Sequence, residues 1–175
     1  MRLRPGTAGE VLGIEARTIA QRALVGDAAL TTIPEIQALC LSVPNVDALV
    51  ERLTDFVAGR MHGISVDPST ESMINMLHVT GGRLPVGDIG RLHGVDVRTV
   101  QRRIVSATGL TPKQMAMIVQ FHRALRLRFY DRLDIVSTAI EAGYADQAHM
   151  SRVFRHMGGF SPARLPDLVL AGFPI

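Results

Sequence analysis

The sequence predicts an all-α protein, in which two helix-turn-helix subdomains are joined by a long linker helix and preceded by a small helical N-terminal region. Two observations support this prediction. A pattern of small, apolar and basic residues recurs about fifty positions apart in the second half of the 175-residue chain, as is typical of one supersecondary unit used twice. Apolar residues elsewhere recur at the spacing of amphipathic helices, and we find no strand-like alternation.

The first 66 residues begin with signals for short helices. Residues 7–10 have the spacing of a capping box, and Gly13 is placed to end the helix that they would start. A second brief helix is expected over residues 33–40, closed before Pro44.

Two better-patterned helices follow. Asn45 is suited to cap the first, in which apolar residues recur over 46–61 at the i, i+3, i+4 spacing of one helix face. The second is expected to begin at Asp67-Pro68 and to stop at the glycine pair 81–82.

Each copy of the repeat has the pattern of a helix, a tight turn and a second helix. Gly90 and Gly94 in the first copy match Ala139 and Gly143 in the second, and a small residue four positions before a glycine lets two helices cross closely. Further matching positions are Val100, Arg102, Ile104, Gly109, Leu110, Thr111 and Pro112 in the first copy and Met150, Arg152, Phe154, Gly159, Phe160, Ser161 and Pro162 in the second.

The second helix of each copy has an apolar side and a polar side. Asp96 and Asp146 stand where these helices should begin, and aspartate is a favoured N-cap residue. Apolar residues then recur at helical spacing, while the opposite side carries basic and amide side chains. Such a helix packs on one side and offers the other to an anionic partner.

A long helix is expected between the two copies. Thr111-Pro112 is suited to start it, and its apolar pattern runs to about Asp131, a length of roughly 28 Å at ~1.5 Å per residue. Lys113 lies near its start, where the helix dipole already favours an anion. Lys113 is therefore a candidate phosphate contact.

The positive charge of the chain is concentrated on the repeat. Residues 84–165 hold twelve Lys or Arg against six Asp or Glu, whereas residues 1–83 hold seven against nine. This asymmetry favours a polyanionic partner for the repeat and gives no such indication for the first half.

The second copy, A-x-x-x-G-Y-x-D-Q-x-H-x-S-R-x-F-R-x-x-x-G-x-S-P, resembles the C-terminal signature of the AraC/XylS family of bacterial transcription regulators. The first copy, D-V-R-T-V-Q-R-R-I-V-S-A-T-G-L-T-P-K, is similar to that family's first helix-turn-helix. The resemblance implies a double helix-turn-helix DNA-binding domain, which we place at residues 67–170. Residues 1–66 would then be a helical region, a remnant of a sensory domain and linker, with most of the usual sensory domain lacking.

The resemblance also implies how such a protein acts. Two recognition helices would enter successive major-groove segments of double-stranded DNA, about 34 Å apart, by docking rather than catalysis. The family's base-facing positions fall on Arg98, Gln101 and Arg102 in the first copy and on Gln147, His149 and Arg152 in the second. Arginine pairs with guanine and glutamine with adenine. The competing interpretation is an ordinary solvated helix face, and Arg102 and Arg152 have a second alternative role in bracing the turn.

Three residues depart from the family pattern. Asp96 replaces a usual serine, Ile104 a usual phenylalanine, and Gln120 stands at a position that is commonly basic. These departures concern the first unit and the linker helix, so they bear on the first unit's sequence preference.

Other classes of function have weaker support. The six histidines lack metal-site spacing and a single cysteine cannot complete a zinc set, so we expect no metal, no cofactor and no catalytic residue. Cys40 as a nucleophile is the enzyme alternative, because bifunctional alkyl-transfer repair proteins can carry this kind of domain, but it lies on an apolar stripe that favours a core cysteine. No effector is indicated.

Localisation and partners follow from the same data. We recognise no signal peptide or membrane-spanning run, and a single cysteine suits a reducing cytoplasm. The expected partner is DNA, with RNA polymerase as a second candidate and no membrane contact. The alternative function is that of a truncated family member that contacts a full-length relative or polymerase without binding DNA.

Overall fold

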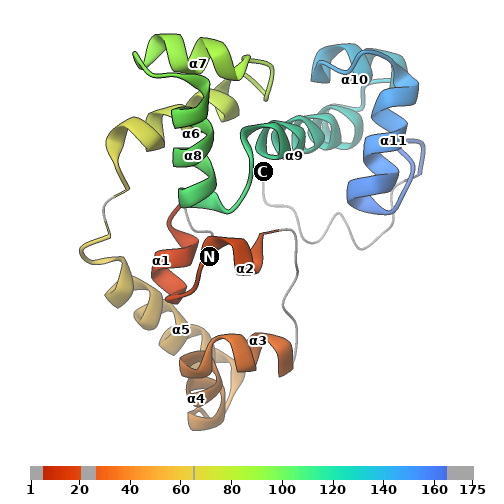
Figure 1. Cartoon of the computed structure of the whole chain (residues 1–175). Coiled ribbons are helices and arrows are strands. Elements are labelled where there is room, and N and C mark those ends of the chain that lie inside the picture. Colours follow the sequence, from red (N-terminus) through yellow and green to blue (C-terminus); the bar gives the residue numbers. More distant parts are fainter. Residues whose placement is uncertain (1–5, 21–26, 65, 165–175) are drawn as a thin grey trace. The chain divides into compact units, whose positions relative to one another are not determined.

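A computed structural model describes residues 6–20, 27–64 and 66–164, and in these ranges every regular element is a helix (Figure 1). The predicted all-α class is therefore confirmed. The helices of the N-terminal region are α1 (Ala8–Leu12), α2 (Ala16–Ile19), α3 (Asp27–Thr32), α4 (Pro34–Ser42) and α5 (Val46–Met61). The others are α6 (Pro68–Val79), α7 (Val86–Leu92), α8 (Val97–Thr108), α9 (Pro112–Leu125), α10 (Ile135–Ala142) and α11 (Gln147–Gly158).

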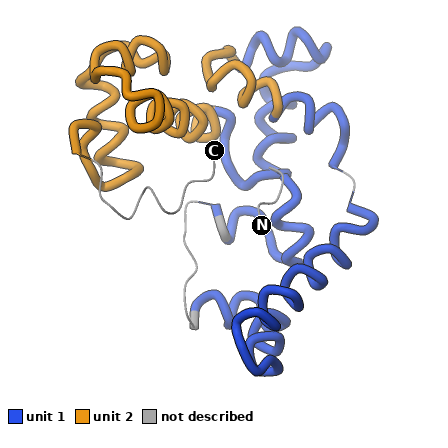
Figure 2. The backbone as a smooth tube through the Cα atoms, turned by 180° about the vertical axis from the view of Figure 1, so that it is seen from behind, with its two compact units in different colours: residues 1–74, 86–112 blue, residues 75–85, 113–175 orange. Residues whose placement is uncertain are grey.

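The chain divides into two compact units (Figure 2). Unit 1 comprises Met1–Ile74 and Val86–Pro112, and unit 2 comprises Asn75–Pro85 and Lys113–Ile175. The N-terminal helices thus share a unit with α7 and α8, whereas α9, α10 and α11 form the other. Helix α6 contributes its first part to unit 1 and its end to unit 2.

In unit 1, α7 and α8 form the first helix-turn-helix. A Cβ atom at Gly90 would lie 2.6 Å from the carbonyl oxygen of Val95, so the crossing requires the small residue that the repeat predicted. Gly94 has φ +64° in the turn. The side chain of Asp96 then accepts a hydrogen bond from the backbone N–H of Thr99 at 2.6 Å, which confirms it as the N-cap of α8.

The N-terminal helices of unit 1 pack among themselves and on α8. Helix α1 contacts α5 and α8, α2 contacts α8, and α4 contacts α3 and α5. Asn45 caps α5 as expected, by accepting a hydrogen bond from Ala48 N–H at 2.9 Å. The apolar face predicted over 46–61 is only partly buried, since Val46 is 72% and Val50 58% exposed.

Helix α1 begins and ends where the sequence indicated, but it is not capped as expected. It starts at Ala8, and Gly13 ends it in the left-handed conformation with φ +68°. The side chain of Thr7 makes no capping hydrogen bond, so the predicted capping box does not form through it. Burial rather than capping therefore holds this short helix, because Val11 is completely buried.

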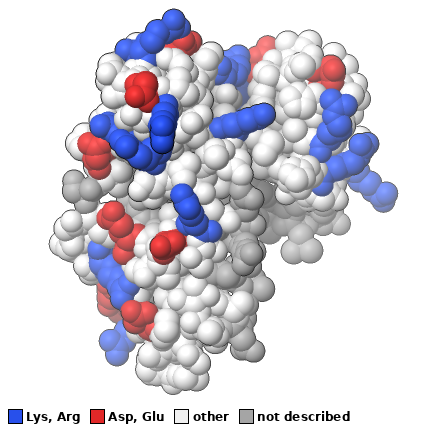
Figure 3. All heavy atoms as spheres, viewed as in Figure 1, with Lys and Arg blue, Asp and Glu red and all other residues white. Residues whose placement is uncertain are grey.

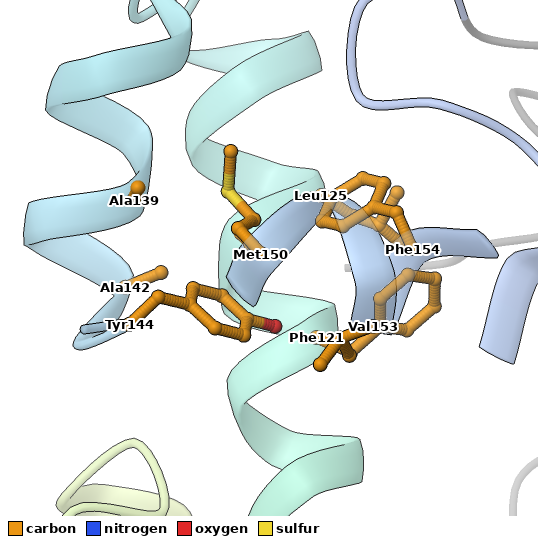
Figure 4. Packing of buried hydrophobic residues seen from close by; sticks show 9 residues of the cluster. Phe121, Leu125, Ala139, Ala142, Tyr144, Met150, Val153 and Phe154 are labelled. Atoms are coloured by element: carbon orange, nitrogen blue, oxygen red, sulfur yellow. The ribbon is translucent and has the colours of Figure 1, made fainter. Parts of the chain in front are cut away.

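In unit 2, α10 and α11 form the second helix-turn-helix against α9. Ala139 is 2% exposed at the crossing, Gly143 has φ +83°, and Asp146 accepts a hydrogen bond from His149 N–H at 2.5 Å. The core beneath them is aromatic and aliphatic, with the rings of Phe121 and Phe154 packed edge to face at a centroid distance of 4.9 Å (Figure 4). The repeat therefore marks two local structures of the same kind.

The predicted long helix between the copies is present. Helix α9 starts at Pro112 and continues from Leu125 into a π-helical turn, Arg126–Tyr130, close to the expected end. The guanidinium of Arg128 donates hydrogen bonds of 3.2 Å to the carbonyl oxygens of Pro162 and Leu133. These bonds tie the end of the linker helix to the segments around it.

Candidate nucleic-acid interface

The outer face of α8 carries the first group of predicted contact residues. Arg98, Gln101 and Arg102 are exposed, whereas Val100 and Ile104 are completely buried. Because residues three and four apart share one face of a helix, the three polar side chains lie together on the solvent side. The structure thus brings together the three residues that the sequence selected in this copy.

Arg98 and Arg102 make this face basic, and the neighbouring Arg103 does not contribute to it. Arg103 turns away from it and donates a hydrogen bond to Ser69 Oγ at 2.9 Å, with Asp67 at 3.7 Å. These contacts hold α6 to α8 inside unit 1. Arg102 makes no hydrogen bond or ion pair with another described residue, so its guanidinium remains available to a ligand.

An aspartate lies at the start of the same helix. The backbone N–H of Thr99, which donates to Asp96, is the main cause that holds the pKa of this carboxyl below its usual value, and the charge of Arg102 adds to the effect. Asp96 is therefore ionised at neutral pH. It places a negative charge at the N-terminal end of the helix that carries the first group of basic residues.

Helix α11 carries the second group. Gln147 and Arg152 are exposed on its outer face, whereas Met150 and Phe154 are completely buried. His149 differs from the other predicted residues, because it is half-buried and its ring packs edge-on against Tyr144 at a centroid distance of 5.3 Å. Only part of the His149 ring is accessible to a partner.

The basic surface of α11 extends further than the sequence indicated. Arg155 is exposed three residues after Arg152, on the same side of the helix. Comparison of the two copies did not select it, because the corresponding position of the first copy is Val105. Its position three residues after Arg152 could have identified it, because that spacing places two side chains on the same side of a helix. In Figure 3, Lys and Arg side chains gather over α11 and, separately, over the part of unit 1 that holds α7 and α8.

Lys113 is exposed at the second position of α9, directly after the buried Pro112. The first backbone N–H groups of a helix lack intrahelical acceptors, and the helix dipole is positive there. The Lys113 ammonium adds a full charge to that end, so the arrangement is suited to an anion.

The described ranges also show where the residues of the alternative chemistries lie. No group of three or more His, Cys, Asp or Glu residues is placed to hold a metal ion there. Cys40 is a free, half-buried cysteine on α4. Among the helices of residues 6–20, 27–64 and 66–164, none has the length and apolarity needed to cross a bilayer.

The fold and the two exposed basic faces define a helix-turn-helix protein. A family model described as a helix-turn-helix domain matches residues 90–166, less than half of the chain. This match supports an AraC-type DNA-binding domain in that part, in agreement with the resemblance of the two motifs. The comparisons with curated proteins and with solved structures each found no significant match.

Proposed function

We propose that this protein is a sequence-specific DNA-binding transcription regulator of the AraC/XylS type. It docks on double-stranded DNA by placing α8 and α11 in successive major-groove segments. One observation carries the proposal: in both copies the apolar side of the second helix is buried while its outer face exposes arginine and glutamine side chains, namely Arg98, Gln101 and Arg102 on α8 and Gln147 and Arg152 on α11. The helix-turn-helix match over residues 90–166 supports the same class.

The proposed base contacts follow the exposed faces. On α8 they are Arg98, Gln101 and Arg102, of which arginine is suited to guanine and glutamine to adenine. On α11 they are Gln147, Arg152 and the accessible edge of His149. Lys113 contacts a phosphate at the start of α9, where it fixes the register of the protein on the duplex without reading sequence.

A second candidate function has one supporting observation. Leu41 of α4 is 81% exposed and Val46 of α5 is 72% exposed. Exposed apolar residues of this kind suit contact with another protein. In this alternative the chain is a truncated family member that contacts a full-length relative or RNA polymerase and does not bind DNA.

Selection of bound sequences from a random DNA pool tests the proposal. We expect an enriched site with two conserved segments about one helical turn apart, as two recognition helices on one face of the duplex require. A gel-shift assay with the enriched site then gives the affinity. A pool that shows no enrichment, together with no shift of genomic fragments, would contradict DNA binding and favour the protein-contact alternative.

A further inference from the structure

A groove of about 480 Å³ lies in unit 1 between α2 and the C-terminal half of α8. Its walls are Glu15, Ala16 and Arg17 on one side and Arg102, Val105 and Ser106 on the other. One wall thus belongs to the N-terminal region, which the proposed function leaves without a role. The other wall belongs to the recognition helix and includes one of its proposed base contacts.

The backbone of α2 is held directly against the end of α8. Gly109, the C-cap of α8, has φ +71°. A Cβ atom there would lie 2.6 Å from the carbonyl carbon and oxygen of Ala16 and 2.8 Å from the amide nitrogen of Arg17. These distances are shorter than side chains tolerate, so only glycine permits the contact. Gly109 therefore allows the backbone at Ala16 and Arg17 to lie directly against the end of α8.

The segment before α2 is anchored as well. Val11 of α1 is completely buried, and its carbonyl oxygen accepts a hydrogen bond of 3.2 Å from the guanidinium of Arg60 on α5. The Ile14 N–H donates to the carbonyl oxygen of Gly9 at 2.9 Å and closes the turn between α1 and α2. The two short helices are thus a packed part of unit 1.

The groups at the groove suit a phosphodiester. Arg17 and Arg102 are both exposed, and neither forms an ion pair within the described part of the chain. Ser106 adds a hydroxyl donor, and Glu15 is the one carboxylate among the six lining residues. A guanidinium presents planar donors that match two phosphate oxygens. The groove therefore has one guanidinium on each wall, and Arg17 is the one that the proposed function does not assign to a base.

We propose that α1 and α2 extend the DNA-binding surface of the first helix-turn-helix, with Arg17 contacting a backbone phosphate beside the bases that α8 reads. This inference rests on the proposed function, because it takes α8 to lie in the major groove. The phosphate belongs to the DNA backbone and not to a free anion. Arg17 then contributes affinity without base preference, as phosphate contacts do.

The test compares full-length wild type with Arg17→Ala on the selected DNA at several salt concentrations. Loss of one phosphate contact should make the slope of log K against log salt less negative by about 0.9. The ratio of the affinity at 0.1 M salt to the affinity at 1 M salt should then be about eightfold smaller than in wild type. The selected sequence should not change. Arg52→Ala is the matched control, because Arg52 is an exposed arginine on α5 of the same unit. Arg17→Lys should keep the salt slope.

A second measurement separates a direct contact from a change in folding. A single neutral methylphosphonate is placed in turn at each backbone position of the site. One position should weaken wild type by about the factor that Arg17→Ala costs, and should cost the Arg17→Ala protein nothing more. Stability of each variant is followed by thermal unfolding.

The outcomes are distinct. If wild type binds DNA but Arg17→Ala and Arg52→Ala behave alike, the inference about Arg17 is wrong and the proposed function stands. Tighter binding by Arg17→Ala would also overturn it, because α2 would then obstruct the DNA. If inorganic phosphate binds the DNA-free protein through Arg17 while DNA affinity is unchanged by Arg17→Ala, the groove takes a free anion instead. If wild type binds no DNA, the proposed function is wrong, and the inference about Arg17, which rests on it, is wrong as well.

Discussion

The side-chain amide of Gln120 on α9 donates a 2.7 Å hydrogen bond to the carbonyl oxygen of Gly143. Gly143 ends α10 in the left-handed conformation, with φ +83°. The last carbonyl groups of a helix lack intrahelical donors, so this bond satisfies one of the groups at the end of the helix. It also joins the linker helix to the turn of the second helix-turn-helix. The residue that departs from the family pattern at this position thus has a structural contact.

Replacing Gln120 with alanine should therefore weaken unit 2. We expect a loss of ~0.5–1.5 kcal/mol in the free energy of unfolding, the usual value of one such bond. Gln120→Lys keeps a donor and should lose less. Gln37→Ala, at an exposed position of α4, is the control. Urea unfolding measures the change, and equal stabilities for Gln120→Ala and Gln37→Ala would show that the bond is not significant.

The recognition helices should act on separate halves of the DNA site. Replacing Arg98 or Gln101 with alanine should cost ~1–3 kcal/mol and relax base choice in one half. Replacing Gln147 should act on the other half. His149→Ala should in addition lower stability, because the ring packs against Tyr144. Selected sequences that stay the same in all four variants would refute the assignment of these helices.

The affinity should depend steeply on salt. Residues 84–165 carry twelve Lys or Arg against six Asp or Glu, and about five to seven phosphate contacts give a slope of roughly −4 to −7. Lys113→Ala should flatten the slope by about one unit and weaken all sequences alike. Arg128→Ala is the control, since this arginine donates to the carbonyl oxygens of Pro162 and Leu133 and should affect stability instead. Binding that hardly responds to salt would contradict the electrostatic basis of the proposal.

The charge at the N-cap of α8 can be removed without losing the cap. Asp96→Ser keeps an acceptor for the Thr99 N–H. It also removes a carboxylate whose pKa is affected by the charge of Arg102, one of the proposed DNA contacts on α8, so DNA affinity should rise at low salt and converge with wild type at high salt. Asp134→Ser is the matched control, because Asp134 caps α10 in the same way but not a recognition helix. Equal affinities of Asp96→Ser and wild type at low salt would show that Asp96 is remote from the DNA.

The division of the chain at residue 66 remains a prediction. A fragment from Asp67 to the C-terminus should fold and select the same DNA sequence as the full chain. It should be less stable, since loss of the buried Val11 side chain alone is worth roughly 1.5–3 kcal/mol. It should also bind more weakly, because Arg17 is absent. A folded fragment that binds no DNA would show that the N-terminal helices are an essential part of the DNA-binding fold.

Several features of this fold were predictable because they depend on a few adjacent residues. Asp96 and Asp146 cap their helices, since an N-cap needs only a suitable side chain and the N–H groups two or three positions later. Gly94 and Gly143 adopt positive φ in the two turns, because other residues do so only at a cost. The repeat revealed both turns, and the spacing of apolar residues indicated which side of α8 and α11 is buried.

Other features depend on which distant segments meet, and only the tertiary structure decided them. Arg102 and Arg103 are identical side chains in adjacent positions, yet one is exposed and the other bonds to Ser69, thirty-four residues earlier. Gly109 contacts Ala16, and the N-terminal helices belong to the same unit as the first helix-turn-helix. The charge distribution and the motifs had instead predicted a boundary at residue 66. Periodicity specifies a helix face but not its partner. The partner is set by how the faces pack in three dimensions.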